Sequence, residues 1–121
     1  EQYLSVSAFS PIVAPTQCPW GEKAFTHYLG HDKATWAEHD TCSLLATRGY
    51  HKPILVEQGM ADNFLAAQLK PELLEAACQQ ADVALTLNRR EGYDHSYYFI
   101  STFFENHLRY HAQYFQEKIQ P

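Results

Sequence analysis

Residues 52–64, with the sequence KPILVEQGMADNF, are the stretch from which the fold of this chain can be predicted. Their apolar run is short and closes at Gly59, a pattern typical of a strand buried on both faces of a parallel sheet. Asp62 follows three residues after that glycine. Residues 83–96, VALTLNRREGYDHS, show the same plan, because a strand-like run is followed by a polar loop that carries His95. The sequence therefore predicts two strands whose exit loops bear ionisable side chains.

Helical patterns alternate with these strands. Residues 69–82, LKPELLEAACQQAD, have Pro71 near their first turn and apolar residues at helical spacing. Residues 31–49 also have helical spacing, with Gly49 as a plausible stop. Residues 96–119 predict a long terminal helix. The inner side of that helix is expected to carry Phe99, Phe103, Phe104, Leu108 and Tyr110.

The N-terminal region predicts one more strand and an irregular excursion. Residues 3–13, YLSVSAFSPIV, are apolar and β-branched, which favours a buried strand and the loop that leaves it. In residues 14–25, APTQCPWGEKAF, we expect no regular element, because Pro15, Pro19 and Gly21 would interrupt one.

The order of predicted elements is strand, excursion with helix, strand, helix, strand, helix. Such alternation indicates parallel strands joined by right-handed crossover helices, the doubly wound α/β class. Three parallel strands make a poor sheet by themselves, and the first strand would need a neighbour along its edge. We therefore expect residues 1–121 to form the C-terminal part of a single α/β domain, with the sheet incomplete in this chain.

Composition excludes several classes of function. The formal net charge is −5 and the chain has no run of Lys or Arg, which disfavours bulk binding to nucleic acid or to an anionic membrane. No apolar run is long enough to span a bilayer, and the first ten residues do not read as a secretory signal. The three cysteines are odd in number and lie outside any C-x-x-C motif, which favours a reducing compartment.

Asp62 and His95 are the candidate catalytic pair. In open parallel sheets, sites form beyond the carboxyl ends of the strands, and neighbouring strands lie only about 4.8 Å apart. A carboxylate that accepts a hydrogen bond from one imidazole nitrogen leaves the other nitrogen free as a general base. The alternative is that His95 is a loop histidine held by local hydrogen bonds. Asp94 is nearer in sequence, but an adjacent residue points away too easily, and we interpret it as a loop or cap residue.

The nucleophile is missing from this pattern. A nucleophile, acid and histidine in that chain order are typical of α/β-hydrolases, which display the serine in a G-x-S-x-G elbow. The sequence contains no such elbow, and no cysteine lies at a strand-to-helix turn. Ser96 adjoins His95 and is interpreted as the cap of the terminal helix. We expect the nucleophile in a segment that precedes Glu1.

Several motifs together resemble the C-terminal part of the S-formylglutathione hydrolase family, also called the esterase D family. They are SVSAFSPIV, QCPWGEKAF, YLG, ILVEQGMADNFL, QLKPELLEAAC and GYDHSYYFISTFFENHLRYHA, and the similarity covers essentially all 121 residues. The resemblance implies a cytoplasmic α/β-hydrolase, commonly a dimer, that cleaves S-formylglutathione to formate and glutathione in formaldehyde detoxification. Many members also hydrolyse small carboxyl esters, and no cofactor or metal is expected.

The resemblance also implies roles for particular residues. The aspartate of GMADNF, Asp62, resembles the triad acid, and the histidine of GYDHSYYF, His95, resembles the triad base. The tryptophan of CPWG, Trp20, resembles a residue that lines the acyl pocket; a core tryptophan is the alternative. The family's serine lies in a G-H-S-M-G-G elbow, expected roughly fifteen residues before Glu1. The oxyanion-hole amides are expected outside this chain too, so the chain needs the N-terminal half and should have little activity alone.

Two positions depart from the family pattern, and two other classes of function stay open. Ala14 stands where asparagine is usual, and Glu57 where aspartate is usual.

His107 and His111 have the i, i+4 spacing of metal ligands, but we interpret them as solvated positions on an amphipathic helix. The last alternative is a non-catalytic α/β module whose strand edge binds another chain.

Overall fold

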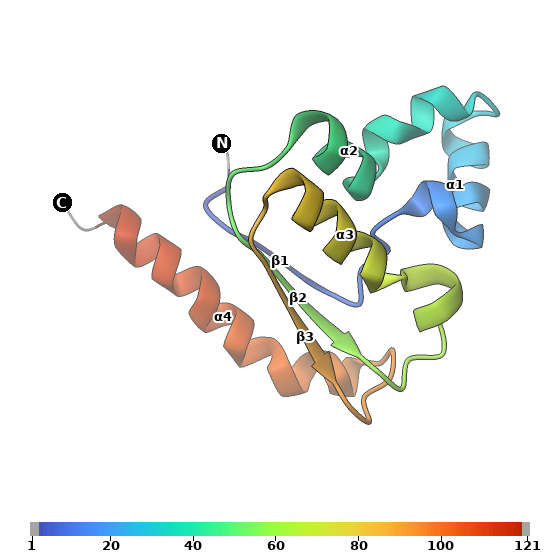
Figure 1. Ribbon diagram of the computed structural model, residues 1–121. Helices are drawn as coiled ribbons and strands as arrows, with labels where there is room; N and C mark the ends of the chain where they lie inside the picture. Colours follow the sequence, from blue (N-terminus) through green and yellow to red (C-terminus); the bar gives the residue numbers. More distant parts are fainter. Residues whose placement is uncertain (1–2, 120–121) are drawn as a thin grey trace.

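The computed structural model describes residues 3–119 and has a three-stranded parallel sheet at its centre (Figure 1). The strands are β1 (Val6–Phe9), β2 (Ile54–Gly59) and β3 (Leu85–Arg90), in the spatial order β1-β2-β3. Because β2 is the middle strand, residues 55–59 are all buried. The predicted α/β class, the parallel pairing and the buried strand expected within residues 52–59 are confirmed.

Helices cover both faces of this sheet. Helices α2 (Thr41–Arg48) and α3 (Pro71–Ala81) pack on one face, while α4 (Tyr97–Ile119) lies on the opposite side (Figure 1). The main core forms between the sheet and the α2–α3 layer. Its buried members are Val13, Ala14, Leu45, Val56, Leu74, Cys78 and Val83. Alternate residues of each strand face this core, so those between them face α4.

The excursion after β1 is more regular than the sequence indicated. A 3₁₀ turn, η1 (Pro15–Gln17), leads into an α-helix, α1 (Pro19–Leu29), where we expected no regular element. The prolines do not break α1, because Pro19 occupies its first turn, where the missing N–H costs nothing. Gly21 is needed for packing, since a Cβ there would lie 2.0 Å from the carbonyl oxygen of Pro15.

The single helix expected over residues 31–49 is divided at Asp40. A 3₁₀ segment, η2 (Lys33–His39), precedes it and α2 follows it. The Asp40 side chain is fully buried, caps α2 through the amide of Ser43 and accepts two hydrogen bonds from Thr16. Asp40 therefore ends η2 through its backbone amide, which donates to Ala37, while its carboxylate begins α2 and ties it to η1.

The inner side of α4 differs in part from the expectation. Phe99 is buried and Phe103 is half-buried, as expected, but Phe104 and Leu108 are exposed. The buried position in their place is His107, which is only 2% exposed. Ser96 accepts a hydrogen bond from the amide of Phe99, which confirms its predicted role as the cap of this helix.

A π-helical turn, η3 (Leu65–Leu69), follows β2 and leads through Lys70 into α3. Lys70 adopts a left-handed conformation with a φ of 46°, which reverses the chain between the two elements. None of the helices within residues 3–119 combines the length and the apolar character needed to cross a membrane.

Candidate active site

The loops that leave β2 and β3 meet at one edge of the sheet. The amide of Met60 donates to the carbonyl oxygen of Arg90, and the amide of Ala61 donates to that of Tyr93, each at 2.9 Å. Gly59 makes this approach possible, because a Cβ at that position would lie 2.3 Å from the Tyr93 oxygen. The parallel pairing of the strands thus continues into their exit loops, which carry the two predicted residues.

Asp62 is buried and its carboxylate is held in one orientation. Its side chain has no solvent exposure, and Oδ1 accepts a 2.8 Å hydrogen bond from the amide of Phe64. The second oxygen, Oδ2, lies 2.9 Å from Nδ1 of His95 and 3.4 Å from Nε2 of Gln58. One oxygen is therefore anchored by its own loop, while the other points to the imidazole.

The geometry assigns the tautomer of His95. A carboxylate only accepts hydrogen bonds, so the Nδ1 that faces Asp62 must carry the proton. Nε2 is then free to act as a base, and the His95 side chain is 40% exposed. This is the arrangement of acid and base in a nucleophilic triad. The structure brings the two residues together as the strand-end argument anticipated.

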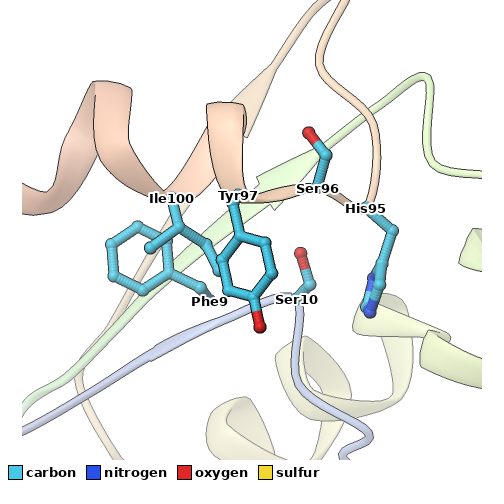
Figure 2. A pocket seen from close by; sticks show the side chains of 6 residues that line it. All are labelled: Phe9, Ser10, His95, Ser96, Tyr97 and Ile100. Carbon is cyan, nitrogen blue, oxygen red and sulfur yellow. The ribbon is translucent and has the colours of Figure 1, made fainter.

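A hollow of about 290 Å³ lies beside His95. Its lining consists of Phe9, Ser10, His95, Ser96, Tyr97 and Ile100. Figure 2 shows Ser10 between the rings of Tyr97 and His95. Ser10 follows β1 directly, has a φ of 49°, and donates its amide to the carbonyl oxygen of Glu57 at 2.9 Å. All three strands therefore deliver residues to this edge of the sheet.

Trp20 lies at the start of α1, away from that lining. Its ring packs on Phe64 with centroids 4.5 Å apart, and its amide donates to the side chain of Gln68. The side chain is 39% exposed, so it is not the core tryptophan of the alternative interpretation. Trp20 is linked to the acid–base pair through Phe64, whose ring also contacts His95.

Within residues 3–119, no serine or cysteine is hydrogen-bonded to Nε2 of His95. Burial raises the pKa of the Cys42 thiol to about 11, and it also raises the pKa of Cys78, so neither thiol is an activated nucleophile. Cys18 is buried. Ser10 is the serine whose backbone most resembles an elbow, but it is followed by Pro11 and not by a helix.

Reasoning from the sequence missed three residues of this site. Gln58 is fully buried, and its Nε2 faces Asp62, while its Oε1 has no hydrogen-bond partner among residues 3–119. A polar residue inside an apolar strand was the available signal for Gln58. Ser10 and Phe64 gave no such signal, because their place in the site depends on tertiary contacts.

A second polar cluster lies under α4. The buried carboxylate of Glu57 accepts hydrogen bonds from Arg90 and Asn88, at 2.8 and 2.9 Å, and lies 3.4 Å from Nε2 of His107. Ser7 lies 2.8 Å from a ring nitrogen of His107 and from one of His111. The interpretation of both histidines as solvated surface positions was wrong, because their rings anchor α4 to β1 and β2.

No group of three or more His, Cys, Asp or Glu side chains in the described part of the chain is arranged to hold a metal ion. His107 and His111 share a helix face, as their spacing required, but this face is turned to Ser7. Nδ1 of His107 and both ring nitrogens of His111 are hydrogen-bonded to serine hydroxyls, while Nε2 of His107 lies 3.4 Å from Glu57 and has no hydrogen-bond partner among residues 3–119.

A parallel sheet with helices on both faces and an Asp–His pair at its carboxyl edge defines part of an α/β-hydrolase fold. The model of the Esterase family matches residues 1–110, and the chain belongs to that family. The solved structure of an S-formylglutathione hydrolase from Agrobacterium tumefaciens is 48% identical to the chain, with a TM-score of 0.90. The match covers 93% of this chain and 41% of that one. The resemblance to the esterase D family, within the α/β-hydrolase superfamily, is thereby confirmed.

Proposed function

We propose that this chain supplies the acid and the base of a Ser–Asp–His triad that hydrolyses thioesters and carboxyl esters. The observation that carries the proposal is the 2.9 Å contact between Oδ2 of Asp62 and Nδ1 of His95. It leaves a free imidazole nitrogen beside an open hollow, in a chain of the Esterase family. The nucleophilic serine and the oxyanion-hole amides come from a segment other than residues 3–119.

The reaction would proceed through an acyl-enzyme. Nε2 of His95 takes the proton of the serine hydroxyl as its oxygen attacks the thioester carbonyl, and the carbon–sulfur bond then breaks. The departing thiolate receives that proton. His95 next takes a proton from water, whose oxygen attacks the acyl-serine. The ester bond then breaks, the imidazolium returns this proton to the serine oxygen, and the acid is released. Asp62 stays ionised throughout and stabilises the imidazolium.

S-formylglutathione is the substrate that we propose, with short-chain esters as further substrates. The support is the 48% identity to an S-formylglutathione hydrolase over nearly the whole of this chain. In this proposal Trp20 and Phe64, which pack together near His95, border the site of the acyl group. The cytoplasmic location and the homodimer that the resemblance implies stay predictions.

Two surfaces of the chain suit the segment that would complete the site. β1 is at the edge of the sheet in the described residues, so one side of its backbone is open to another strand. On α4 an apolar stripe is at least half exposed and consists of Phe104, Leu108, Phe115 and Ile119. The chain spans 41% of the length of the related hydrolase, and we propose that the nucleophile-bearing part packs on these two surfaces.

The test is hydrolysis of S-formylglutathione and p-nitrophenyl acetate by this chain, with and without a separately expressed N-terminal segment that carries a G-x-S-x-G elbow. We expect activity only when both parts are present, and its loss in His95→Ala. Ser10→Ala is the second variant, and it should keep the activity. Activity of the chain alone that disappears in Ser10→Ala would instead make Ser10 the nucleophile. A folded complex without activity would favour the non-catalytic module.

A further inference from the structure

One residue, Phe64, contacts all three of the predicted site residues. Its amide donates a 2.8 Å hydrogen bond to Oδ1 of Asp62. Its ring meets the ring of His95 edge to face, at 87° with centroids 5.4 Å apart. The same ring packs on Trp20, with centroids 4.5 Å apart and a tilt of 52°. Phe64 thus connects the acid loop, the base loop and the start of α1.

The backbone and the ring of Phe64 act on different parts of the site. Any residue except proline at this position supplies the amide that holds Asp62. Phe64 is 38% exposed, so it is not a core residue, and the two aromatic contacts of its ring are with Trp20 and His95. Edge-to-face contacts at this separation are attractive and depend on orientation.

The His95 side chain has few other contacts that would fix its ring. Its only side-chain hydrogen bond within residues 3–119 runs from Nδ1 to Asp62, and 40% of the side chain is open to solvent. A single hydrogen bond allows the ring to swing about its bond to Cβ. The ring of Phe64 lies against this imidazole, and Trp20 packs on Phe64 from the side of α1.

We propose that Phe64 is a positioning residue. Its ring keeps Nδ1 of His95 directed at the Asp62 carboxylate, and its contact with Trp20 makes this orientation depend on Trp20 as well. The kinetic consequence rests on the function proposed above, but the effect on the imidazole does not. Phe64→Leu keeps the amide and removes the aromatic edge, while Phe64→Tyr keeps both. The two variants therefore separate the role of the ring from that of the backbone.

The first experiment records the ring ¹⁵N resonances of His95 by NMR in this chain. The wild type and Phe64→Tyr should show the widely separated Nδ1 and Nε2 shifts of a single tautomer. In Phe64→Leu this separation should fall, because the imidazole ring leaves Asp62 part of the time.

Trp20→Leu should reduce the separation of the two nitrogen shifts as well, but by less. Phe115→Leu, the same substitution at an exposed phenylalanine on α4, is the control and should leave His95 unchanged. Unchanged His95 resonances in folded Phe64→Leu would overturn the proposal.

The second experiment measures hydrolysis by the reconstituted protein with the same Phe64 variants. A displaced base lowers kcat, so Phe64→Leu should lose about ten- to a hundredfold in kcat. Because Phe64 also borders the proposed acyl site, KM should change too, but by less than kcat. Phe64→Tyr should retain activity. If the NMR change occurs but the wild-type assembly hydrolyses nothing, the positioning role is upheld and the proposed function is refuted. Wild-type kcat in Phe64→Leu would overturn the positioning role alone.

Discussion

The amide of Ala61 donates a 2.9 Å hydrogen bond to the carbonyl oxygen of Tyr93, so the loop of the acid and the loop of the base are joined through their backbones. Asp62 follows Ala61 directly, and His95 lies two residues after Tyr93. The distance between the two side chains is therefore set largely by main-chain contacts. Substitutions that separate these loops should disturb the pair even when both side chains are intact.

Gly59→Ala is the substitution that should separate them. Its Cβ would lie 2.3 Å from the Tyr93 oxygen, a backbone atom that cannot rotate away. We expect a loss of about 1–3 kcal/mol in the free energy of unfolding, together with a changed His95 environment by NMR. Gly30→Ala is the control. Gly30 has a φ of 87° and no atom within 4 Å, so alanine there should lower stability and leave His95 unaffected.

Asp62→Asn should lower kcat of the reconstituted enzyme by about 10⁴-fold, because an amide that donates to Nδ1 stabilises the wrong tautomer of the base. Asp94→Asn is the matched control, since Asp94 adjoins His95 in sequence but is exposed. We expect it to keep kcat within a few-fold. Equal losses in the two variants would mean that the acid has been wrongly assigned.

Two carboxylates near α4 should differ in their contribution to stability: Glu57, which is buried under the helix, and Glu105, which is exposed on its surface. Glu57→Gln removes the charge that faces Arg90 in the interior and should cost about 1.5–3 kcal/mol in the free energy of unfolding. Glu105→Gln removes the exposed partner of Arg109 and should cost about 0.5 kcal/mol or less. Urea denaturation of both variants measures the difference. Similar costs would show that Glu57 contributes no more than a surface charge.

The strands and the Asp–His pair were predictable from the sequence because their signals are local. An apolar run that ends in glycine predicted β2, and parallel strands place their exit loops at one edge whatever the rest of the fold does. Asp62 and His95 could thus be paired from their positions after two strands. No knowledge of the surrounding helices was needed.

The remaining features depend on partners that are distant in sequence. Gly21 looks like a helix breaker until it is seen to pack on Pro15, which is what allows α1 to form there. His107 is a polar residue type, yet it is buried because its ring contacts Ser7 and the carboxylate of Glu57. Phe64 and Ser10 join the site only once α1 and β1 are in place.

The buried ring of His107 should make the fold sensitive to acid. Burial lowers the pKa of this histidine below its ordinary 6.5, and so do nearby His111 and Arg90, while Glu57 opposes the shift without reversing it. Below about pH 6.5 the unfolded chain takes up a proton at this position before the folded chain does. The free energy of unfolding should therefore fall as the pH falls from that value towards the lower pKa of the folded state.

His107→Gln should show a shallower pH dependence of the free energy of unfolding than the wild type, whatever its absolute stability. His31→Gln, at an exposed site, is the control. Denaturation curves at several pH values measure these slopes, and equal slopes for His107→Gln and the wild type would contradict the assignment.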